Sequence, residues 1–296
     1  MNILITGGTG FIGKSLSAHL LSNGHQVYVL SRQKAPVNGL DDKVKLIQIL
    51  DPQSHIFDAI INLAGEPLNK KRWSAQVQNN LIQSRVNITQ KLLDYVAHAQ
   101  KKPHTLISGS AIGYYGSNDH LYFKEETPPH SDCFTHQLCK AWEEEALQAK
   151  KFGVRVCLLR TGIVLGKEGG ALKEMLPSFR WGVGAQLGNG KQWMSWIHQI
   201  DVVRAIEFLM LHNELDGPFN LTAPTPVTNS VFTLELAKKL HRPLFLRMPD
   251  WTVKMLFGEM GQALLLQGQN VIPQRLVDSG FSFTYNTLDE AFASLF

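Results

Sequence analysis

The sequence has few cysteines and no long apolar segment, and both absences exclude classes of protein. Its three cysteines, Cys133, Cys139 and Cys157, include no Cys-x-x-Cys spacing, and none lies near a histidine pair with the spacing of metal ligands. A disulfide framework or a metal site is therefore not expected. No segment reaches the roughly 18 apolar residues that a membrane span needs. The N-terminus opens directly into a strand-like MNILITGG, without a charged region followed by a long apolar run. We expect a cytoplasmic protein without a membrane partner.

Charge of one sign does not accumulate either. Lys and Arg number 29 and Asp and Glu number 25, which gives a formal net charge of +4 over 296 residues. The longest basic run is residues 70–72, which is typical of a solvated loop. We therefore expect no nucleic-acid partner. The hydrophobic content of 44% is enough for one large core, or for a core with a smaller second lobe.

Short apolar runs alternate with longer amphipathic stretches in the first part of the chain. The runs are NILIT, QVYVLS, KLIQIL, DAIINLAG, HTLISGS and VRVCLLRTGIVLG. Because a parallel strand buried on both faces needs a crossover helix, this alternation predicts an α/β fold with a Rossmann-like doubly wound parallel sheet. In the last third of the chain, Gly and Pro residues interrupt the helical segments, and this change predicts a smaller C-terminal lobe. We place the nucleotide-binding domain at 1–165, with a returning segment near 198–224, and most of the lobe at 166–296.

The segment TGGTGFIG, residues 6–13, follows the first predicted strand and opens the first predicted helix. Gly7, Gly10 and Gly13 form the pattern G-x-x-G-x-x-G. The first glycine allows a tight turn, the second lets backbone N–H groups approach a pyrophosphate, and the third lets helix and strand pack closely. Because strand, turn and helix follow in the order that this mechanism needs, we predict dinucleotide binding. The alternative is that the glycines serve only the turn.

The residues after the second predicted strand favour NADP(H). A carboxylate there would bind the ribose 2′-hydroxyl of NAD and would repel a 2′-phosphate. The sequence instead has Ser31, which can donate a hydrogen bond, and Arg32, which can pair with a phosphate dianion. A surface arginine after a strand is also common. The missing acid nevertheless makes NADP(H) the predicted cofactor.

Motifs along the whole chain indicate a family. NLAGEP at 62–67, SGSAIGYYG at 108–116, LRTGIVLG at 159–166 and SWIH at 195–198 accompany the glycine-rich turn. With these motifs the chain resembles the extended short-chain dehydrogenase/reductases. Within them it is similar to the YfcH-type NAD-dependent epimerase/dehydratase-like proteins, also labelled sugar-nucleotide epimerase family 39U. The resemblance implies a Rossmann-like domain that binds NADP(H) and a small lobe that closes a cleft over the nicotinamide, with an unsettled substrate.

Carried over position by position, the resemblance implies contacts with each part of the cofactor. The cofactor-binding residues that it predicts are Gly7, Thr9, Gly10, Phe11, Ile12 and Gly13 at the pyrophosphate, Ser31 and Arg32 at the 2′-phosphate, Leu63, Ala64, Gly65 and Glu66 near the adenine ribose, and Ser108 and Arg160 toward the nicotinamide. Each position has an alternative as strand or turn filler. The occurrence of all of them in the right order favours the cofactor.

The sequence lacks the Tyr-x-x-x-Lys pair that moves the proton in the wider superfamily. The helix within THQLCKAWE offers two substitutes, either His136 with Lys140 or Thr135 with Cys139. At 100° per residue, Thr135 and Cys139 lie at the edge of the apolar stripe, and His136 and Lys140 lie on the far side with Glu143. In related enzymes a glutamate often follows the lysine by four, and Glu143 follows Cys139 by four. We predict that Thr135 and Cys139 face the cofactor and that the far side is solvated.

Other side chains are candidates for the chemistry. Ser110 matches the superfamily's substrate-binding Ser or Thr, and Tyr115 is the predicted substitute for the missing proton donor. Tyr114, Glu66 and His198 are further candidates. For each of them, and for Tyr115, a purely structural role is the stronger alternative. The tryptophans at 73, 193 and 196 could line an apolar substrate pocket or belong to the core.

Together these observations predict an NADP(H)-dependent oxidoreductase or nucleotide-sugar-epimerase-like enzyme with an atypical acid. The alternative is a non-catalytic NADP(H)-binding redox sensor or regulatory protein. The substrate, the direction of reaction and the oligomeric state do not follow from the sequence.

Overall fold

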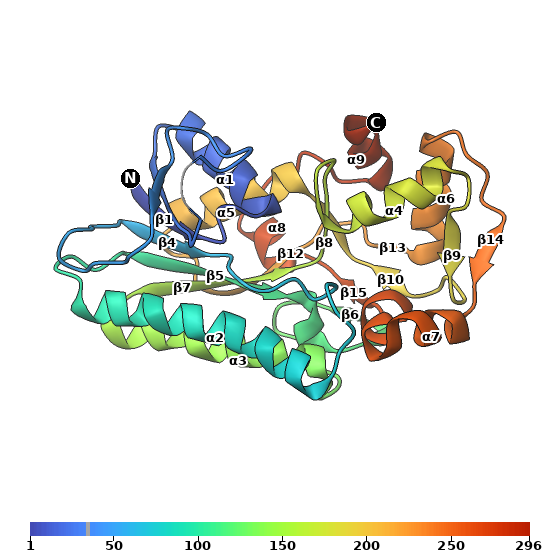
Figure 1. Cartoon of the computed structure of the whole chain (residues 1–296), viewed down its shortest axis with the longest axis horizontal. Helices are drawn as coiled ribbons and strands as arrows, with labels where there is room; N and C mark the ends of the chain where they lie inside the picture. The colour runs from blue at the N-terminus through green and yellow to red at the C-terminus, as the bar shows by residue number, and fades with distance from the viewer. Residues whose placement is uncertain (34–35) are drawn as a thin grey trace.

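The computed structural model describes residues 1–33 and 36–296 (Figure 1). Its centre is a seven-stranded sheet in the order β12-β7-β5-β4-β1-β2-β3, in which all neighbouring strands are parallel. These strands are β1 (Asn2–Thr6), β2 (Gln26–Leu30), β3 (Lys45–Ile47), β4 (Ala59–Asn62), β5 (Thr105–Ala111), β7 (Arg155–Thr161) and β12 (Gly217–Leu221). The predicted Rossmann-like doubly wound sheet is confirmed.

The order of the strands locates a ligand site. From β1 the chain proceeds outward to β2 and β3, and it then returns to add β4, β5, β7 and β12 on the other side of β1. The direction of winding therefore reverses between β1 and β4. Ligands of doubly wound sheets bind at the carboxyl ends of the strands beside such a reversal.

Helices cover both faces of the sheet (Figure 1). One face packs against α1 (Phe11–Ser22) and α5 (Gln199–Leu211), and the other packs against α2 (Ala75–His98) and α3 (Phe134–Leu147). Because side chains alternate along a strand, β1 sends Ile3 and Ile5 to the first core and Leu4 to the second. Both cores exclude water, which explains why the strands read as nearly continuous apolar runs.

The remaining elements form the smaller lobe and its connections. The lobe contains α4 (Gly170–Arg180), β9 (Ala185–Leu187), β10 (Trp193–Met194), β13 (Val227–Thr228), α6 (Asn229–Lys239), β14 (Leu246–Met248), α7 (Asp250–Gly261), the π-helical turn η3 (Gln262–Leu266) and α9 (Leu288–Leu295). The connecting elements are η1 (Ile112–Tyr115), β6 (Asn118–Phe123), η2 (Gln148–Phe152), β8 (Ile163–Leu165), β11 (Trp196–His198), β15 (Gln269–Val271) and α8 (Gln274–Asp278). No helix among the described residues is long and apolar enough to cross a membrane.

The two parts of the chain are interleaved. β12 follows α5 and completes the edge of the large sheet beside β7, and β15 pairs with β6. Gln199, the first residue of α5, donates hydrogen bonds to Phe11 O at 3.0 Å and to Ser15 Oγ at 2.7 Å. Segments from the second half of the chain therefore support the helix that follows the glycine-rich turn.

Candidate functional site

The glycine-rich turn is held by backbone contacts that leave no room for side chains. Gly7 has a φ of 71°, which favours glycine, and a Cβ there would lie 2.7 Å from the Leu63 carbonyl carbon. A Cβ on Gly13 would lie 2.3 Å from Gly7 O. Gly13 therefore has no room for a side chain against the backbone of the turn.

The start of α1 is free to receive an anion. Gly10 is the N-cap of α1, so no side chain caps this helix, and its first turn contains no acidic residue. The first N–H groups of a helix lack intrahelical acceptors, and the helix dipole favours negative charge there. These groups stand beside the reversal between β1 and β4. The predicted pyrophosphate contacts, including those of Thr9, Phe11 and Ile12, are compatible with this arrangement.

Ser31 and Arg32 follow the end of β2, next to β1 in the sheet. Ser31 N donates to Ile47 O at 3.0 Å, and Ser31 Oγ accepts a hydrogen bond from Gln33 N at 3.1 Å. Arg32 is exposed. A fixed serine and a solvated cation therefore stand where the 2′-phosphate is expected.

The segment after β4 passes the mouth of the turn. Leu63 N donates to Thr6 O at 3.1 Å, and Leu63 and Ala64 are half-buried while Gly65 and Glu66 are exposed. Arg85 of α2 fixes the main chain, because its Nη2 donates to Glu66 O at 3.0 Å. A Cβ on Gly65 would lie 2.9 Å from Arg85 Cζ. The glycine thus permits the close approach of α2 to this segment.

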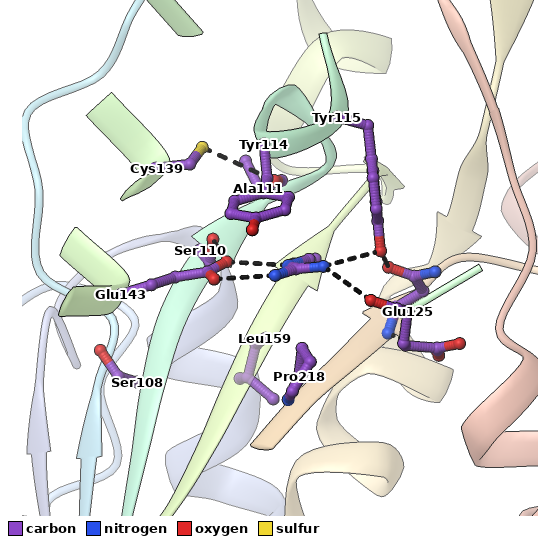
Figure 2. A network of polar contacts seen from close by, with 12 residues as sticks. Ser108, Ser110, Ala111, Tyr114, Tyr115, Glu125, Cys139, Glu143, Leu159 and Pro218 are labelled. Atoms are coloured by element: carbon purple, nitrogen blue, oxygen red, sulfur yellow. Dashed lines mark hydrogen bonds and ion pairs between the residues drawn. The ribbon is translucent and has the colours of Figure 1, made fainter. Parts of the chain in front are cut away.

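A buried polar cluster lies on the α3 side of β5, β7 and β12 (Figure 2). Strand register places Ser110 opposite Arg160, and Arg160 opposite Asn220. Glu143 of α3 joins them: Ser110 Oγ donates to Glu143 Oε1 at 2.6 Å, and Arg160 Nε and Nη2 donate to Glu143 Oε1 and Oε2, each at 2.9 Å. The strong bidentate ion pair with Glu143 raises the pKa of Arg160 despite burial. The Arg160 guanidinium therefore keeps its charge in the interior.

Tyr115 and Glu125 close the other side of the cluster. Arg160 Nη1 donates to Tyr115 Oη and to Glu125 O, both at 3.1 Å. Tyr115 Oη donates to Asn220 Oδ1 at 2.7 Å, and Asn220 N donates to Glu125 Oε1 at 3.0 Å. Burial raises the pKa of Tyr115 to about 12 and also raises the pKa of Glu125. The cluster joins segments far apart in the sequence.

This cluster corrects three predictions. Tyr115 is fully buried and its proton is held by Asn220, so it is not placed as a proton donor to a substrate. Ser110 directs its only proton to Glu143 instead of to a substrate oxygen. The Arg160 guanidinium is bound inside the protein, so it does not make the predicted contact with the nicotinamide end. Ser108 is also fully buried, two residues before Ser110 on the same face.

The register of α3 is as predicted for Cys139 and Lys140. Cys139 is buried and its Sγ donates weakly to Ala111 O at 3.5 Å, with Thr135 half-buried one turn earlier. Burial raises the pKa of Cys139 to about 12. Lys140 is exposed and pairs with Glu144 at 4.0 Å. The position of the usual lysine is therefore occupied by a buried neutral thiol.

The far side of α3 is not solvated throughout, which corrects the prediction for His136 and Glu143. His136 is only 7% exposed, its Nδ1 donates to Tyr114 O at 2.6 Å, and its ring packs against the Tyr114 ring. The chain that follows β5 covers this part of the helix. The helical periodicity did not predict this burial, because His136 is covered through a polar contact with a distant segment and adds no apolar residue to the pattern.

The other candidates occupy structural positions. His198 Nδ1 caps α5 by accepting a hydrogen bond from Ile200 N at 3.1 Å, and burial lowers the pKa of His198. Trp196 belongs to the lobe core, where its Nε1 donates to Thr225 O at 3.0 Å. Trp73 packs edge to face on Phe134 with ring centroids 4.7 Å apart. Tyr114 is half-buried over the Arg160 guanidinium at 3.5 Å.

Sequence reasoning did not identify Glu143, Asn220 and Glu125 as members of one site. The only local signal was the spacing of Glu143 four residues after Cys139. Nothing in the sequence links Asn220 to Glu125, and the two residues are brought together by the pairing of β12 with β7 and by the turn after β6.

Comparison with known proteins identifies the family. Residues 3–221 match the NAD dependent epimerase/dehydratase family, and residues 248–295 match a domain of unknown function, DUF1731. The chain belongs to this epimerase family. Epimerase family protein ML0860 of Mycobacterium leprae is 40% identical over 98% of this chain and 94% of that protein. The chloroplastic SDR39U1 homolog of Arabidopsis thaliana is 36% identical over 100% of this chain and 86% of its own length.

Solved structures agree with this membership in the epimerase family. Human epimerase family protein SDR39U1, crystallised with NADPH, superposes with a TM-score of 0.90 at 30% identity, covering 100% of this chain and 99% of that one. UDP-glucose 4-epimerase of Thermotoga maritima shares the fold with a TM-score of 0.80 at 19% identity, over 100% of this chain and 97% of that one. The expected membership of family 39U among the extended short-chain dehydrogenase/reductases is confirmed.

Proposed function

We propose that this epimerase-family protein binds NADP(H) and acts as a redox sensor, without the proton transfer of the ordinary short-chain dehydrogenases. One observation carries the second part: the hydroxyl protons of Ser110 and Tyr115 are both donated to buried protein groups. The positions of the usual tyrosine and lysine hold Thr135 and Cys139. A carbonyl that accepts hydride from NADPH becomes an alkoxide and needs a proton, and none of these four groups is placed to give it.

The binding part of the proposal rests on the turn and its surroundings. A dinucleotide fits there because no side chain caps the helix start, the glycines admit close backbone approach, and Arg32 is an exposed cation after β2, the neighbour of β1. Bound NADP(H) would supply or accept hydride. The human relative with the same fold was crystallised with NADPH, which supports the 2′-phosphate preference proposed for this chain.

A second candidate function is an NADP(H)-dependent oxidoreductase or epimerase-like enzyme that uses Tyr114. Among the described residues, the Tyr114 hydroxyl has no hydrogen-bond partner, and its ring lies over Arg160. This phenol is half-buried near the carboxyl end of β5. It is therefore the hydroxyl in this region that remains available to a substrate.

Hydride transfer distinguishes the two functions. NADPH deuterated at the transferred position is incubated with the protein and a broad panel of carbonyl compounds, and label in any product is measured by mass spectrometry. We expect tight NADPH binding, no labelled product, and different hydrogen-exchange patterns for the NADPH and NADP⁺ complexes. Labelled product from the wild type that is lost in Tyr114→Phe would establish the enzyme and contradict the sensor.

Arg32 provides a separate test of cofactor choice. In thermal-shift titrations, NADPH is expected to bind more tightly than NADH, and Arg32→Ala is expected to remove most of the difference. A hydrogen bond to a charged partner contributes about 1.5–3 kcal/mol, so the loss for NADPH is about tenfold to hundredfold. Lys140→Ala is the matched control, because it removes an exposed cation whose ion pair is with the exposed Glu144. Equal affinities of the wild type for the two cofactors would contradict the 2′-phosphate prediction.

A further inference from the structure

The C-terminal lobe exposes an unusual set of large apolar side chains. Trp181 is 84% exposed, Phe245 is 88% exposed and Trp251 is 66% exposed. Val183, Leu246, Met255 and Leu256 are also exposed around them. Soluble proteins rarely leave such side chains unpaired in a group, and such groups mark interaction surfaces.

These side chains share one edge of the lobe, which we call the aromatic edge and define as residues 180–183 and 242–256. The parallel pairing of β14 with β9 sets Leu246 opposite Ala185, so Phe245 and Val183 lie at the same end of the pair. Arg242 Nε donates to Arg180 O at 2.8 Å, which joins the two segments. α7, with Trp251 in its first turn, begins two residues after β14. In Figure 1, β14 lies at the side of the lobe away from the large sheet, with α7 below it.

The aromatic edge is also basic. It carries four exposed cations, Arg180, Arg242, Arg247 and Lys254. Its only acidic residue is Asp250, which is exposed and lies beside Gly188, so the four cations outnumber the single carboxylate. The sequence as a whole is nearly balanced in charge, so this local excess is a property of the edge.

The shape and charge of the edge select its partner. Side chains that are this exposed stand out from the surface and do not line a groove, so a rigid protein partner would need a separate recess for each of them. A lipid surface adapts to protruding groups, tryptophan and phenylalanine are stable at the boundary between headgroups and acyl chains, and arginine and lysine are attracted to anionic headgroups. We propose that the aromatic edge binds the surface of an anionic lipid bilayer.

This proposal differs from the expectation of no membrane partner, which rested on the absence of an apolar span. Peripheral binding needs no span, because a few apolar side chains and a basic surface are sufficient. The proposal is also independent of the cofactor site. The aromatic edge contains none of the residues predicted to contact NADP(H).

The test uses the full chain and lipid vesicles. We expect cosedimentation with vesicles that contain phosphatidylglycerol, release by added salt, and little binding to pure phosphatidylcholine. The triple variant Trp181→Ser, Phe245→Ser, Trp251→Ser should lower the partition coefficient at least about tenfold. Arg247→Ala with Lys254→Ala should lower it by about fivefold per charge. NADPH binding should be unchanged in both variants, which shows that they are folded.

Matched controls replace similar residues far from the edge. Ile49→Ser with Leu211→Ser removes apolar groups that are 76% and 53% exposed, and Lys43→Ala with Lys91→Ala removes two exposed cations. Both controls should bind vesicles like the wild type. No binding to anionic vesicles, equal binding to neutral ones, or full binding by the triple variant would overturn the proposal. Two other results would also overturn it. A dimer that is seen in light scattering and is dissociated by the triple variant would assign the edge to a second copy of the chain. Binding of polyglutamate in the absence of vesicles would assign the edge to an acidic protein.

Discussion

Replacing Glu143 by alanine is expected to lower the free energy of unfolding by about 3–5 kcal/mol, because it leaves a buried charge without its partner. Arg160 would keep its bonds to Tyr115 and Glu125 O but would lose both bonds to the carboxylate. Ser110 would also lose its acceptor. Urea unfolding followed by circular dichroism measures the change.

The neighbouring Glu144 gives the control for this substitution. Its exposed ion pair with Lys140 spans 4.0 Å, so Glu144→Ala should change stability by less than about 1 kcal/mol. Glu143→Leu combined with Arg160→Met removes both charges together and should recover much of the loss. If the double variant is no more stable than Glu143→Ala, the cost does not come from the uncompensated arginine. Glu143→Gln keeps the shape of the side chain and removes its charge. It replaces Glu143→Ala in the unfolding measurement if the alanine variant does not fold.

Gly13→Ala is expected to weaken NADPH binding at least a hundredfold, about 2.7 kcal/mol, and to destabilise the fold by about 1–3 kcal/mol. The added methyl group would lie 2.3 Å from Gly7 O and 2.5 Å from Gly8 Cα. Both atoms belong to the backbone, so the turn itself must move. Isothermal titration with NADPH and thermal unfolding measure the two effects.

Gly24→Ala separates loss of stability from loss of binding. Gly24 has a φ of 80° and open space around its missing Cβ. Alanine there should therefore cost about 1–2 kcal/mol of backbone energy, while NADPH affinity remains at the wild-type value. If Gly13→Ala binds NADPH as tightly as Gly24→Ala does, the turn is not the dinucleotide site.

The part of the fold that sequence patterns predicted is the part that local rules govern. Strands buried on both faces read as apolar runs, and the turn between β1 and α1 needs glycine at fixed positions, so both could be located without the structure. The same holds for Cys139 and Lys140, because one wheel separates the side of α3 that packs on β5 from the side that carries Lys140. The predicted division into a domain ending near 165 and a lobe remains a prediction.

The polar site could not be predicted in the same way. The sequence predicted Tyr115 as a proton donor, Arg160 as a cofactor contact and Glu143 on a solvated helix face. Each of these predictions rested on the residues of one segment. The three side chains meet through the register of the strands and through a loop that covers α3. A buried charge is stable only with its partner. That partner can be identified only when the fold is known, because the two residues are far apart in the sequence.

The interleaving of the chain has a consequence for how the protein folds. β12 lies beside β7 in the sheet, but 55 residues of chain separate the two strands. α5, which covers the core beside α1, follows α4, β9 and β10 of the lobe in the sequence. Before β12 pairs with it, β7 is an edge strand whose unpaired N–H and C=O groups can pair with other chains. Completion of the sheet therefore requires slow, long-range loop closure. Assembly of the nucleotide half is coupled to assembly of the lobe, and the partly folded chain is most prone to aggregation in the interval between them.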